Sequence, residues 1–216
     1  MIMQRCRVFA NPQPRVQPET VSAGRRHRVG IYGGTFNPIH NAHLLVADQV
    51  GQSLSLDQVR FMPDATPPHV DKKTAIAADL RLAMIKLAIK DNPLFAIEES
   101  ELQRGGVSYT YDTMKKMIEQ HPTTDYYFII GGDMVDYLPK WHRIDELVRL
   151  PRFHFVGVRR PGAKNESVYP VIWVDVPLVS FSSTDIRRRV AQGLPIRYMV
   201  PDAVAAFIKE HHLYHE

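Results

Sequence analysis

The stretch 28–50 constrains this chain more than any other part of it. It opens with the apolar run Val29–Tyr32, which is typical of a buried strand in a parallel sheet. Gly33 and Gly34 follow at once, and we expect the backbone to turn sharply there and to leave room for a close approach. The apolar spacing after this loop predicts a helix over about 42–54.

Two histidines, His40 and His43, lie at the mouth of that helix. Unpaired backbone N–H groups and the helix dipole make a helix N-terminus an anion site, and Thr35, Asn37 and the glycine N–H groups precede this one. Residues three apart on a helix share a face, so the two imidazoles could also bind zinc. A zinc site needs further ligands, and no cysteine or nearby glutamate offers them. We therefore expect the two imidazoles to donate hydrogen bonds to phosphate oxygens. The simpler alternative is that both histidines are surface residues of a loop.

Strands and helices alternate along the rest of the chain. We expect strands at Val29–Tyr32, Val59–Met62, Phe95–Ile97, Tyr126–Ile130, Phe153–Val158 and Val171–Val174. Helices are expected at about Ala42–Leu54, Ala78–Lys90, Tyr109–Gln120, Ile144–Arg149, Ser183–Gln192 and Asp202–His211. This alternation predicts an α/β fold with a doubly wound, Rossmann-like parallel sheet and helices on both faces. Ligands of such sheets bind at the carboxyl ends of the strands, here the loops 33–41, 63–73, 131–141 and 176–183.

Length and composition limit the remaining possibilities. We expect residues 1–27, with three prolines and no periodicity, to form a flexible extension, and residues 28–216 to form a single domain. The single cysteine, Cys6, excludes an internal disulfide and favours the cytoplasm, and no apolar run is long enough to cross a membrane. A net charge of +4 favours anionic partners only weakly. An RNA-binding protein is the alternative from another class, but no RNA-binding motif supports it, so we expect no nucleic acid partner.

A second cluster of polar residues runs from Ser182 to Arg189. Ser182 and Asp185 have the spacing of a capping box, which marks another helix N-terminus able to hold phosphate. Arg187 lies one turn into the helix and can reach back to the same anion. Successive helical positions diverge by about 100°, so Arg187 and its two arginine neighbours cannot all face one ligand. An ordinary capped helix with a basic exposed side is the alternative.

These residues carry a resemblance. The run from Gly33 to His43, GGTFNPIHNAH, is similar to the first signature of the nucleotidylyltransferase superfamily, and SSTDIR, from Ser182 to Arg187, is similar to its second. More narrowly, the chain resembles bacterial nicotinate-nucleotide adenylyltransferases. The supporting segments are 63–69, 81–84, 106–113, 131–141 and 201–208, so the resemblance covers about residues 28–214.

The resemblance implies transfer of an adenylyl group from ATP to nicotinate mononucleotide, giving the dinucleotide and pyrophosphate. By the same resemblance the catalytic residues are His40, His43 and Arg187. The ATP-binding residues are Gly33, Gly34, Thr35, Phe36, Gly131, Asp133, Ser182 and Ser183. The residues for nicotinate mononucleotide are Asn37, His69, Tyr109, Thr110 and Trp141. Mg²⁺ is expected to arrive with ATP, held mostly by phosphate oxygens and water, with no metal site of the protein's own.

Two positions depart from the family pattern. Ala42 replaces the glycine between the histidines, and Val70 replaces a basic residue whose charge Lys72 or Lys73 could supply. These departures leave open a nucleotide-binding protein of the same fold that has lost the chemistry. A related transferase with a pantetheine-phosphate or cytidylyl acceptor is the nearer alternative, and the segments around Tyr109 and Trp141 argue against it. The sequence leaves open whether the protein forms a homo-oligomer.

Overall fold

The computed structural model describes residues 24–65, 75–159, 165–177 and 179–215. Six strands form one parallel sheet in the order β3-β2-β1-β4-β5-β6. The strands are β1 (His27–Gly34), β2 (Gln58–Pro63), β3 (Phe95–Ile97), β4 (Thr124–Gly131), β5 (Phe153–Val158) and β6 (Val171–Val174). This strand order is that of a doubly wound Rossmann-like sheet, which confirms the predicted fold class.

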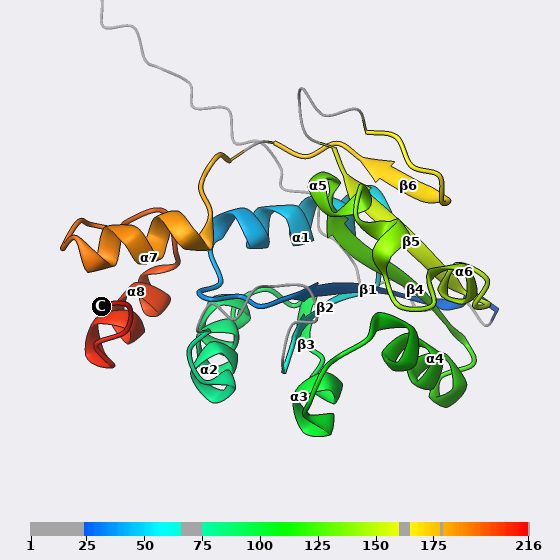
Figure 1. Cartoon of the computed structure of the whole chain (residues 1–216), viewed down its shortest axis with the longest axis horizontal. Helices are drawn as coiled ribbons and strands as arrows, with labels where there is room; N and C mark the ends of the chain where they lie inside the picture. The colour runs from blue at the N-terminus through cyan, green and yellow to red at the C-terminus, as the bar shows by residue number, and fades with distance from the viewer. Residues whose placement is uncertain (1–23, 66–74, 160–164, 178, 216) are drawn as a thin grey trace, which may run out of the picture.

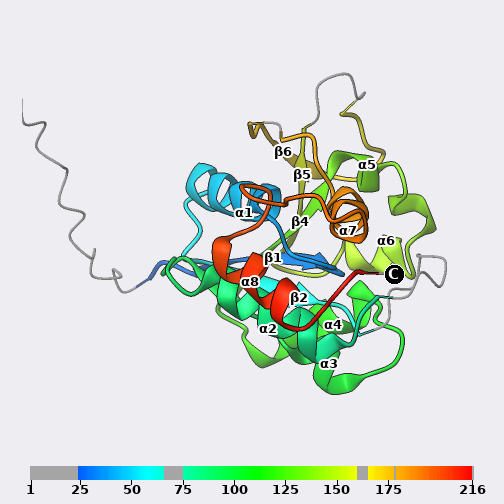
Figure 2. The ribbon, with the colours of Figure 1, turned by 90° about the vertical axis from the view of Figure 1, so that its left-hand side faces the viewer.

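Helices cover both faces of the sheet, as predicted (Figure 1). The longer helices are α1 (Asn41–Ser53), α2 (Ala78–Ile89), α4 (Thr110–Gln120), α7 (Ser183–Ala191) and α8 (Asp202–Glu210). The short ones are α3 (Ser100–Arg104), α5 (Gly132–Val135), the 3₁₀ turn η1 (Leu138–Lys140) and α6 (Ile144–Leu147). The hydrophobic core on one face includes residues of α1, α2, α7 and α8, and the core on the other includes residues of α4, α5 and α6. The C-terminal helix α8 packs beside α2 (Figure 2).

The strand order reverses between β1 and β4. From β1 the chain builds outward through β2 and β3, and it then returns to place β4 on the other side of β1. Because the connections on the two sides leave in opposite directions, a crevice opens beyond the carboxyl ends of this strand pair. In the register of the pair, Tyr32 near the end of β1 lies opposite Ile129 of β4. The sequence-predicted site residues of the first loop begin at this point.

Two sequence-based expectations differ from the structure. The elements α3, α5 and η1 were not expected, because five, four and three residues are too few to show a period. Gly33 and Gly34 do not form the expected turn, since both still belong to β1. Just before β1, the exposed side chains of Arg25 and Arg26 pair with Asp57 at 3.2 Å and with Asp125 at 2.8 Å.

The expected extension 1–27 falls mostly outside the described residues. The described part begins at residue 24, and β1 already starts at His27. Among the described residues, no helix is long and apolar enough to cross a membrane.

Candidate active site

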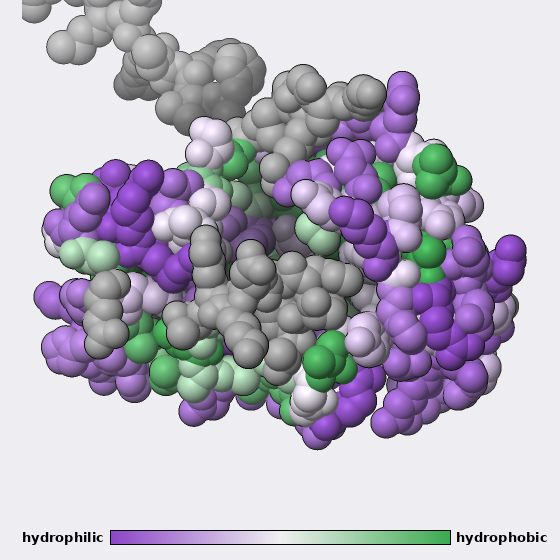
Figure 3. All heavy atoms as spheres, in the orientation of Figure 1, coloured by the Kyte–Doolittle hydropathy of each residue, from purple (hydrophilic) through white to green (hydrophobic). Residues whose placement is uncertain are grey.

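Two cavities meet at the carboxyl ends of β1 and β4. The first, here called the aromatic cavity, has a volume of about 280 Å³, and its lining includes Tyr109, Phe128 and Trp141. The second, here called the histidine cavity, has a volume of about 350 Å³ and is lined by residues from the starts of α1 and α7. Tyr32 and Gly131 line both cavities. On the surface, a hollow lies between the side of α7 and that of α5 (Figure 3).

The two histidines form a reciprocal cap at the start of α1. His40 has an extended backbone and is the N-cap, so it lies just outside the helix rather than on its face. The Nδ1 atom of His40 accepts from the backbone N–H of His43, and the Nδ1 atom of His43 accepts from that of His40, each at 3.3 Å. The rings stack with centroids 3.6 Å apart and planes 14° apart. The predicted pairing of the imidazoles therefore arises through capping and stacking.

Burial keeps both imidazoles neutral. Desolvation lowers the pKa of His40 to about 4. It lowers the pKa of His43 well below its usual value, and the charge that His40 would carry lowers it further. Because each Nδ1 accepts a hydrogen bond, each neutral ring carries its proton on Nε2. The pair thus presents two N–H donors of fixed tautomer at the start of a helix, where backbone N–H groups also lack partners.

The start of α7 is bound to the first loop. Ser182 and Asp185 form the predicted capping box, with Ser182 Oγ accepting from the Asp185 N–H at 3.2 Å and donating to Asp185 Oδ2 at 2.7 Å. The Ser183 hydroxyl donates to the carbonyl of Pro38 at 2.8 Å. Arg187 donates to the carbonyl of Asn37 at 2.7 Å. Two segments that lie about 145 residues apart in the sequence therefore share the histidine cavity.

The aromatic cavity brings Tyr109, Thr110 and Trp141 together. Tyr109 precedes α4, and its ring lies 4.4 Å from that of His142. The ring of Trp141 meets Phe128 and Phe155 edge to face, at 6.0 and 5.7 Å between centroids. Aromatic side chains held by packing on both sides of a cavity are suited to a flat ring.

Comparisons with known proteins agree with this geometry. A profile of the cytidylyltransferase-like family matches residues 31–189. A protein of Lactiplantibacillus plantarum named "Probable nicotinate-nucleotide adenylyltransferase" is 59% identical, over 94% of this chain and 95% of its own length. One of Enterococcus faecalis with the same name is 55% identical, over 93% of this chain and 91% of its own length. The chain belongs to the nicotinate-nucleotide adenylyltransferase family.

Solved structures agree on the fold of this family member. A Plasmodium falciparum nicotinic acid mononucleotide adenylyltransferase complexed with APC superposes with a TM-score of 0.73 at 20% identity. The superposition covers 88% of this chain and 98% of that one. The same parasite protein complexed with NaAD gives the same TM-score at 21% identity. At such low identity the likeness concerns the fold alone.

The remaining residues predicted for ATP lie in several places. Gly33, Gly34 and Thr35 line the aromatic cavity rather than the histidine cavity. Phe36 is buried with a positive φ of 47°, and its ring packs edge-on to that of His43 at 5.1 Å. Asp133 is exposed in the first turn of α5 and is not among the described residues that line the two cavities.

Two other predicted residues, Asn37 and Arg187, are not among the described residues that line the two cavities. Asn37 is buried, and its Oδ1 accepts from the hydroxyl of Tyr214 at 2.8 Å instead of facing the aromatic cavity. Arg187 holds the Asn37 carbonyl and does not appear among the described lining residues. His69 lies outside the described residues, as do Val70, Lys72 and Lys73, for which the sequence left a choice open.

Sequence reasoning missed a buried polar network beside the aromatic cavity. Arg81, only 2% exposed, donates to the carbonyls of Thr35 and Asp64 at 2.8 Å each and pairs with the Asp64 carboxylate at 3.3 Å. The Thr35 hydroxyl donates to the other Asp64 oxygen at 2.8 Å. Asp64 directly follows β2, so its place at a carboxyl strand end was a usable signal. Glu101 also lines the cavity, but it belongs to the short helix α3, which left no signal in the sequence.

Both carboxylates of this cavity titrate abnormally. Burial raises the pKa of Asp64, against the opposing effects of the Thr35 hydroxyl and the Arg81 charge. Burial also raises the pKa of Glu101, which is 5% exposed, while the Thr113 hydroxyl lowers it and the charge of Asp64 raises it. Perturbed acids in a cleft are a mark of functional sites.

Nucleotidyltransferases of this family use ATP, generally with a divalent metal. The described residues contain no cluster of three or more His, Cys, Asp or Glu side chains placed to hold such an ion. The described lining of the histidine cavity has hydroxyls, from Ser182, Ser183 and Thr184, but no carboxylate. This donor set fits an ion that binds mainly through phosphate oxygens and water.

Proposed function

We propose that this chain transfers the adenylyl group of ATP to nicotinate mononucleotide, forming nicotinate adenine dinucleotide and pyrophosphate for NAD biosynthesis. The observation that carries the proposal is the meeting of two different cavities at the switch point between β1 and β4. One has neutral imidazole donors and a helix N-terminus for a triphosphate, and the other has aromatic walls for a pyridine ring. The family membership of the chain supports the same reaction.

The reaction is an in-line displacement at the α-phosphorus of ATP. An oxygen of the 5′-phosphate of the mononucleotide forms the new bond to the α-phosphorus, and the bond from that phosphorus to the bridging oxygen breaks. The bonding electrons leave with pyrophosphate. The attacking phosphate is already an anion at neutral pH, so the step needs no general base. The protein must align two anions that repel each other and stabilise the charge that develops on the leaving group.

The histidine cavity supplies that stabilisation in our proposal. The Nε2–H groups of His40 and His43 donate to the α- and β-phosphates. The N-terminus of α7, at Ser182 and Ser183, binds the outer phosphates together with Arg187. Arg187 contacts the Thr184 hydroxyl at 3.1 Å, and the proposal has it exchange that contact for a phosphate oxygen. Gly131 and Asp133, at the start of α5, are proposed for the ATP ribose.

The aromatic cavity supplies the acceptor site. Tyr109 and Trp141 hold the pyridine ring between them, and Thr110 with the first N–H groups of α4 binds the carboxylate of nicotinate. We propose that Asn37 and His69 bind the rest of the mononucleotide. For ATP we propose Gly33, Gly34, Thr35 and Phe36. We further propose Mg²⁺ as the cation that accompanies ATP, the cytoplasm as the compartment, and residues 28–216 as one catalytic domain.

Pyrophosphate release tests the proposal. The purified protein is given ATP and Mg²⁺ with nicotinate mononucleotide, nicotinamide mononucleotide or phosphopantetheine, and the dinucleotide product is identified by chromatography. We expect release with nicotinate mononucleotide and a higher kcat/KM for it than for the amide. Turnover with phosphopantetheine alone would assign another acceptor. Binding of ATP without pyrophosphate release in the presence of any of the three acceptors would favour a nucleotide-binding protein that has lost the chemistry.

A further inference from the structure

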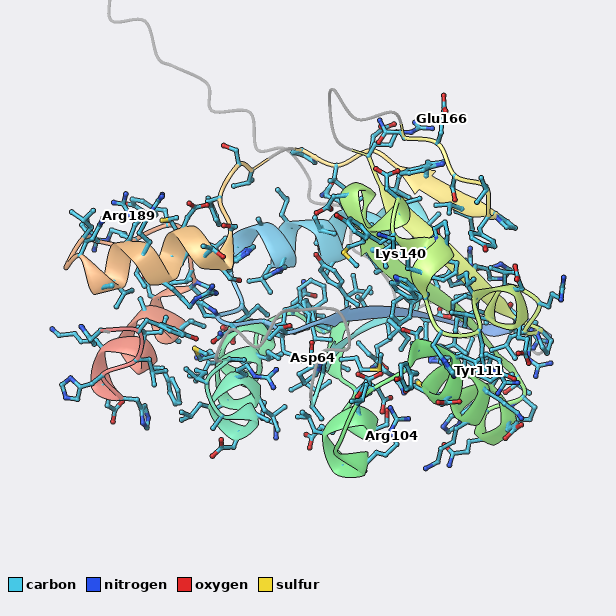
Figure 4. All side chains as sticks on the ribbon, in the orientation of Figure 1. Asp64, Arg104, Tyr111, Lys140, Glu166 and Arg189 are labelled. Carbon is cyan, nitrogen blue, oxygen red and sulfur yellow. The ribbon has the colours of Figure 1, made fainter. Side chains whose placement is uncertain are left out.

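The aromatic cavity has an unexpected charge for a site that receives an anionic mononucleotide. Among its described lining residues there are two carboxylates, Asp64 and Glu101, and no lysine or arginine. Figure 4 labels Asp64 near the middle of the molecule and Arg104 on the outer helix α3. The two acids are close enough that the charge of Asp64 affects the titration of Glu101.

The cavity also holds a buried hydroxyl beside Glu101. Ser108, a residue 5% exposed, lines the cavity, and a hydrogen bond from its side chain lowers the pKa of Glu101. Ser108 precedes Tyr109 and Thr110, which are proposed to bind the nicotinate group. Glu101 therefore lies beside the segment that is assigned to the ring of the acceptor.

Aromatic walls with buried acids are the chemistry of a cation site. The faces of Trp and Tyr rings attract cations, and a buried carboxylate is stabilised by an opposite charge. A pyridine ring joined through its nitrogen to ribose is a permanent cation. We propose that Glu101 is a specificity-determining residue that selects acceptors whose ring carries this positive charge. The inference rests on the proposed function and adds to it the property of the ring that the site recognises.

Glu101 rather than Asp64 is the group whose charge is available to the ligand. Asp64 is already paired with the guanidinium of Arg81 at 3.3 Å and bound by the Thr35 hydroxyl. Glu101 accepts from the neutral hydroxyl of Thr113 at 3.0 Å, and the cation that acts on it, Arg104, is exposed. A ring cation in the cavity would therefore gain more from Glu101 than from Asp64.

The titration of Glu101 agrees with this assignment. Burial without a paired cation raises its pKa, so the ionised form is held at a cost. A cation bound opposite favours the ionised form and lowers that pKa again. Binding of a cationic ring and ionisation of Glu101 therefore support each other.

The test uses two acceptors that differ in ring charge. Nicotinate mononucleotide is compared with the C-ribonucleotide of benzoic acid, which keeps the carboxylate, the ribose phosphate and a flat ring but lacks the charge. For the unaltered protein we expect kcat/KM to be about tenfold higher for the charged ring. For Glu101→Gln we expect the ratio to fall to about twofold, because the negative charge of the carboxylate is lost. The amide oxygen still accepts from Thr113, so the local hydrogen bond is kept.

Glu119→Gln, the same change at an exposed position of α4, is the matched control and should keep the tenfold ratio. An equal kcat/KM for both acceptors in the unaltered protein would overturn the inference, and so would an unchanged ratio in a folded Glu101→Gln variant. If Glu101→Gln does not fold, the ratio of the two kcat/KM values in the unaltered protein decides. Asp64→Asn is a second variant, and we expect it to lower this ratio less than the loss of the Glu101 charge would. Absence of any turnover with nicotinate mononucleotide would instead contradict the proposed function.

Discussion

In the proposed reaction, the chemistry depends most directly on the stacked imidazoles of His40 and His43. Their reciprocal hydrogen bonds use both Nδ1 atoms and fix the donor tautomer without any carboxylate. Neutral donors stabilise charge on phosphate and do not give up a proton to the leaving group. The structure thus favours electrostatic stabilisation over acid catalysis.

Removing one imidazole tests this role. We expect His43→Ala to lower kcat by about 10² or more, the usual loss when a preorganised donor to a transition state is deleted. Steady-state pyrophosphate release measures the effect, and circular dichroism shows whether α1 is retained without its second capping residue. His154→Ala, at an exposed position of β5, is the control and should leave kcat unchanged. Turnover of His43→Ala within a few-fold of the unaltered protein would exclude the role.

The lowered pKa values of both histidines predict a pH dependence of stability. An unfolded histidine titrates near 6.5, whereas folding lowers the pKa of His40 to about 4. Below about pH 6.5 the unfolded chain therefore binds more protons than the folded one, so stability falls as the pH drops toward about 4. We expect Tm to decrease from pH 7 to pH 5, and to decrease less in His40→Asn, which keeps an N-cap side chain. Equal decreases in both proteins would contradict this assignment.

At the scale of elements, the two helix N-termini at the histidine cavity differ in their caps. The first uses imidazoles, and the second uses Ser182 and Asp185, whose carboxylate also accepts from the Ser182 N–H at 3.0 Å. The Asp185 carboxylate is thereby occupied within the box, and its hydrogen bonds with Ser182 lower its pKa. A phosphate can then approach the helix end without meeting an unpaired negative charge.

Substitutions at Ser182 separate the structural from the functional role of this cap. Ser182→Asn keeps a neutral capping group, so we expect Tm and the KM for ATP to change little. Ser182→Asp also caps the helix but adds a negative charge beside the triphosphate, so the KM for ATP should rise about tenfold or more at unchanged acceptor KM. Thermal unfolding and initial rates at varied ATP provide the two readouts. A similar KM for ATP in both variants would place the triphosphate elsewhere.

The sequence predicts the long elements well because their periodicity extends over many residues. All six strands of the described sheet contain the expected range or coincide with it, and α7 and α8 begin at the expected Ser183 and Asp202. It does not predict the short elements around the aromatic cavity, since a single turn of helix leaves no period. The glycines after Tyr32 were misinterpreted for a different reason. Their small size serves aromatic packing, because a Cβ on Gly33 would lie 3.0 Å from the Phe128 ring.

At the scale of the whole molecule, the site depends on contacts between distant segments. The motifs indicated which segments meet, but they did not predict the hydrogen bond from Arg187 to the carbonyl of Asn37. A hydrogen bond from a guanidinium to a remote carbonyl has no sequence pattern. Asn37 shows the same limit, since its bond to Tyr214 joins the first loop to the end of the chain. Such contacts depend on the packed fold and become visible only with it.

The Arg81 network is the strongest of these links, because it ties the loop after β1 to the end of β2 and to the segment before α2 through Thr35, Asp64 and Ile76. We expect Arg81→Met to lower the free energy of unfolding by about 3–5 kcal/mol, since it leaves the Asp64 carboxylate, which is only 14% exposed, beside unpaired carbonyls. Urea unfolding measures the loss. Arg81→Met combined with Asp64→Asn should recover part of it, because the remaining group is then neutral. Additive losses in the double variant would mean that the two side chains act independently and that Arg81 stabilises the protein through packing alone.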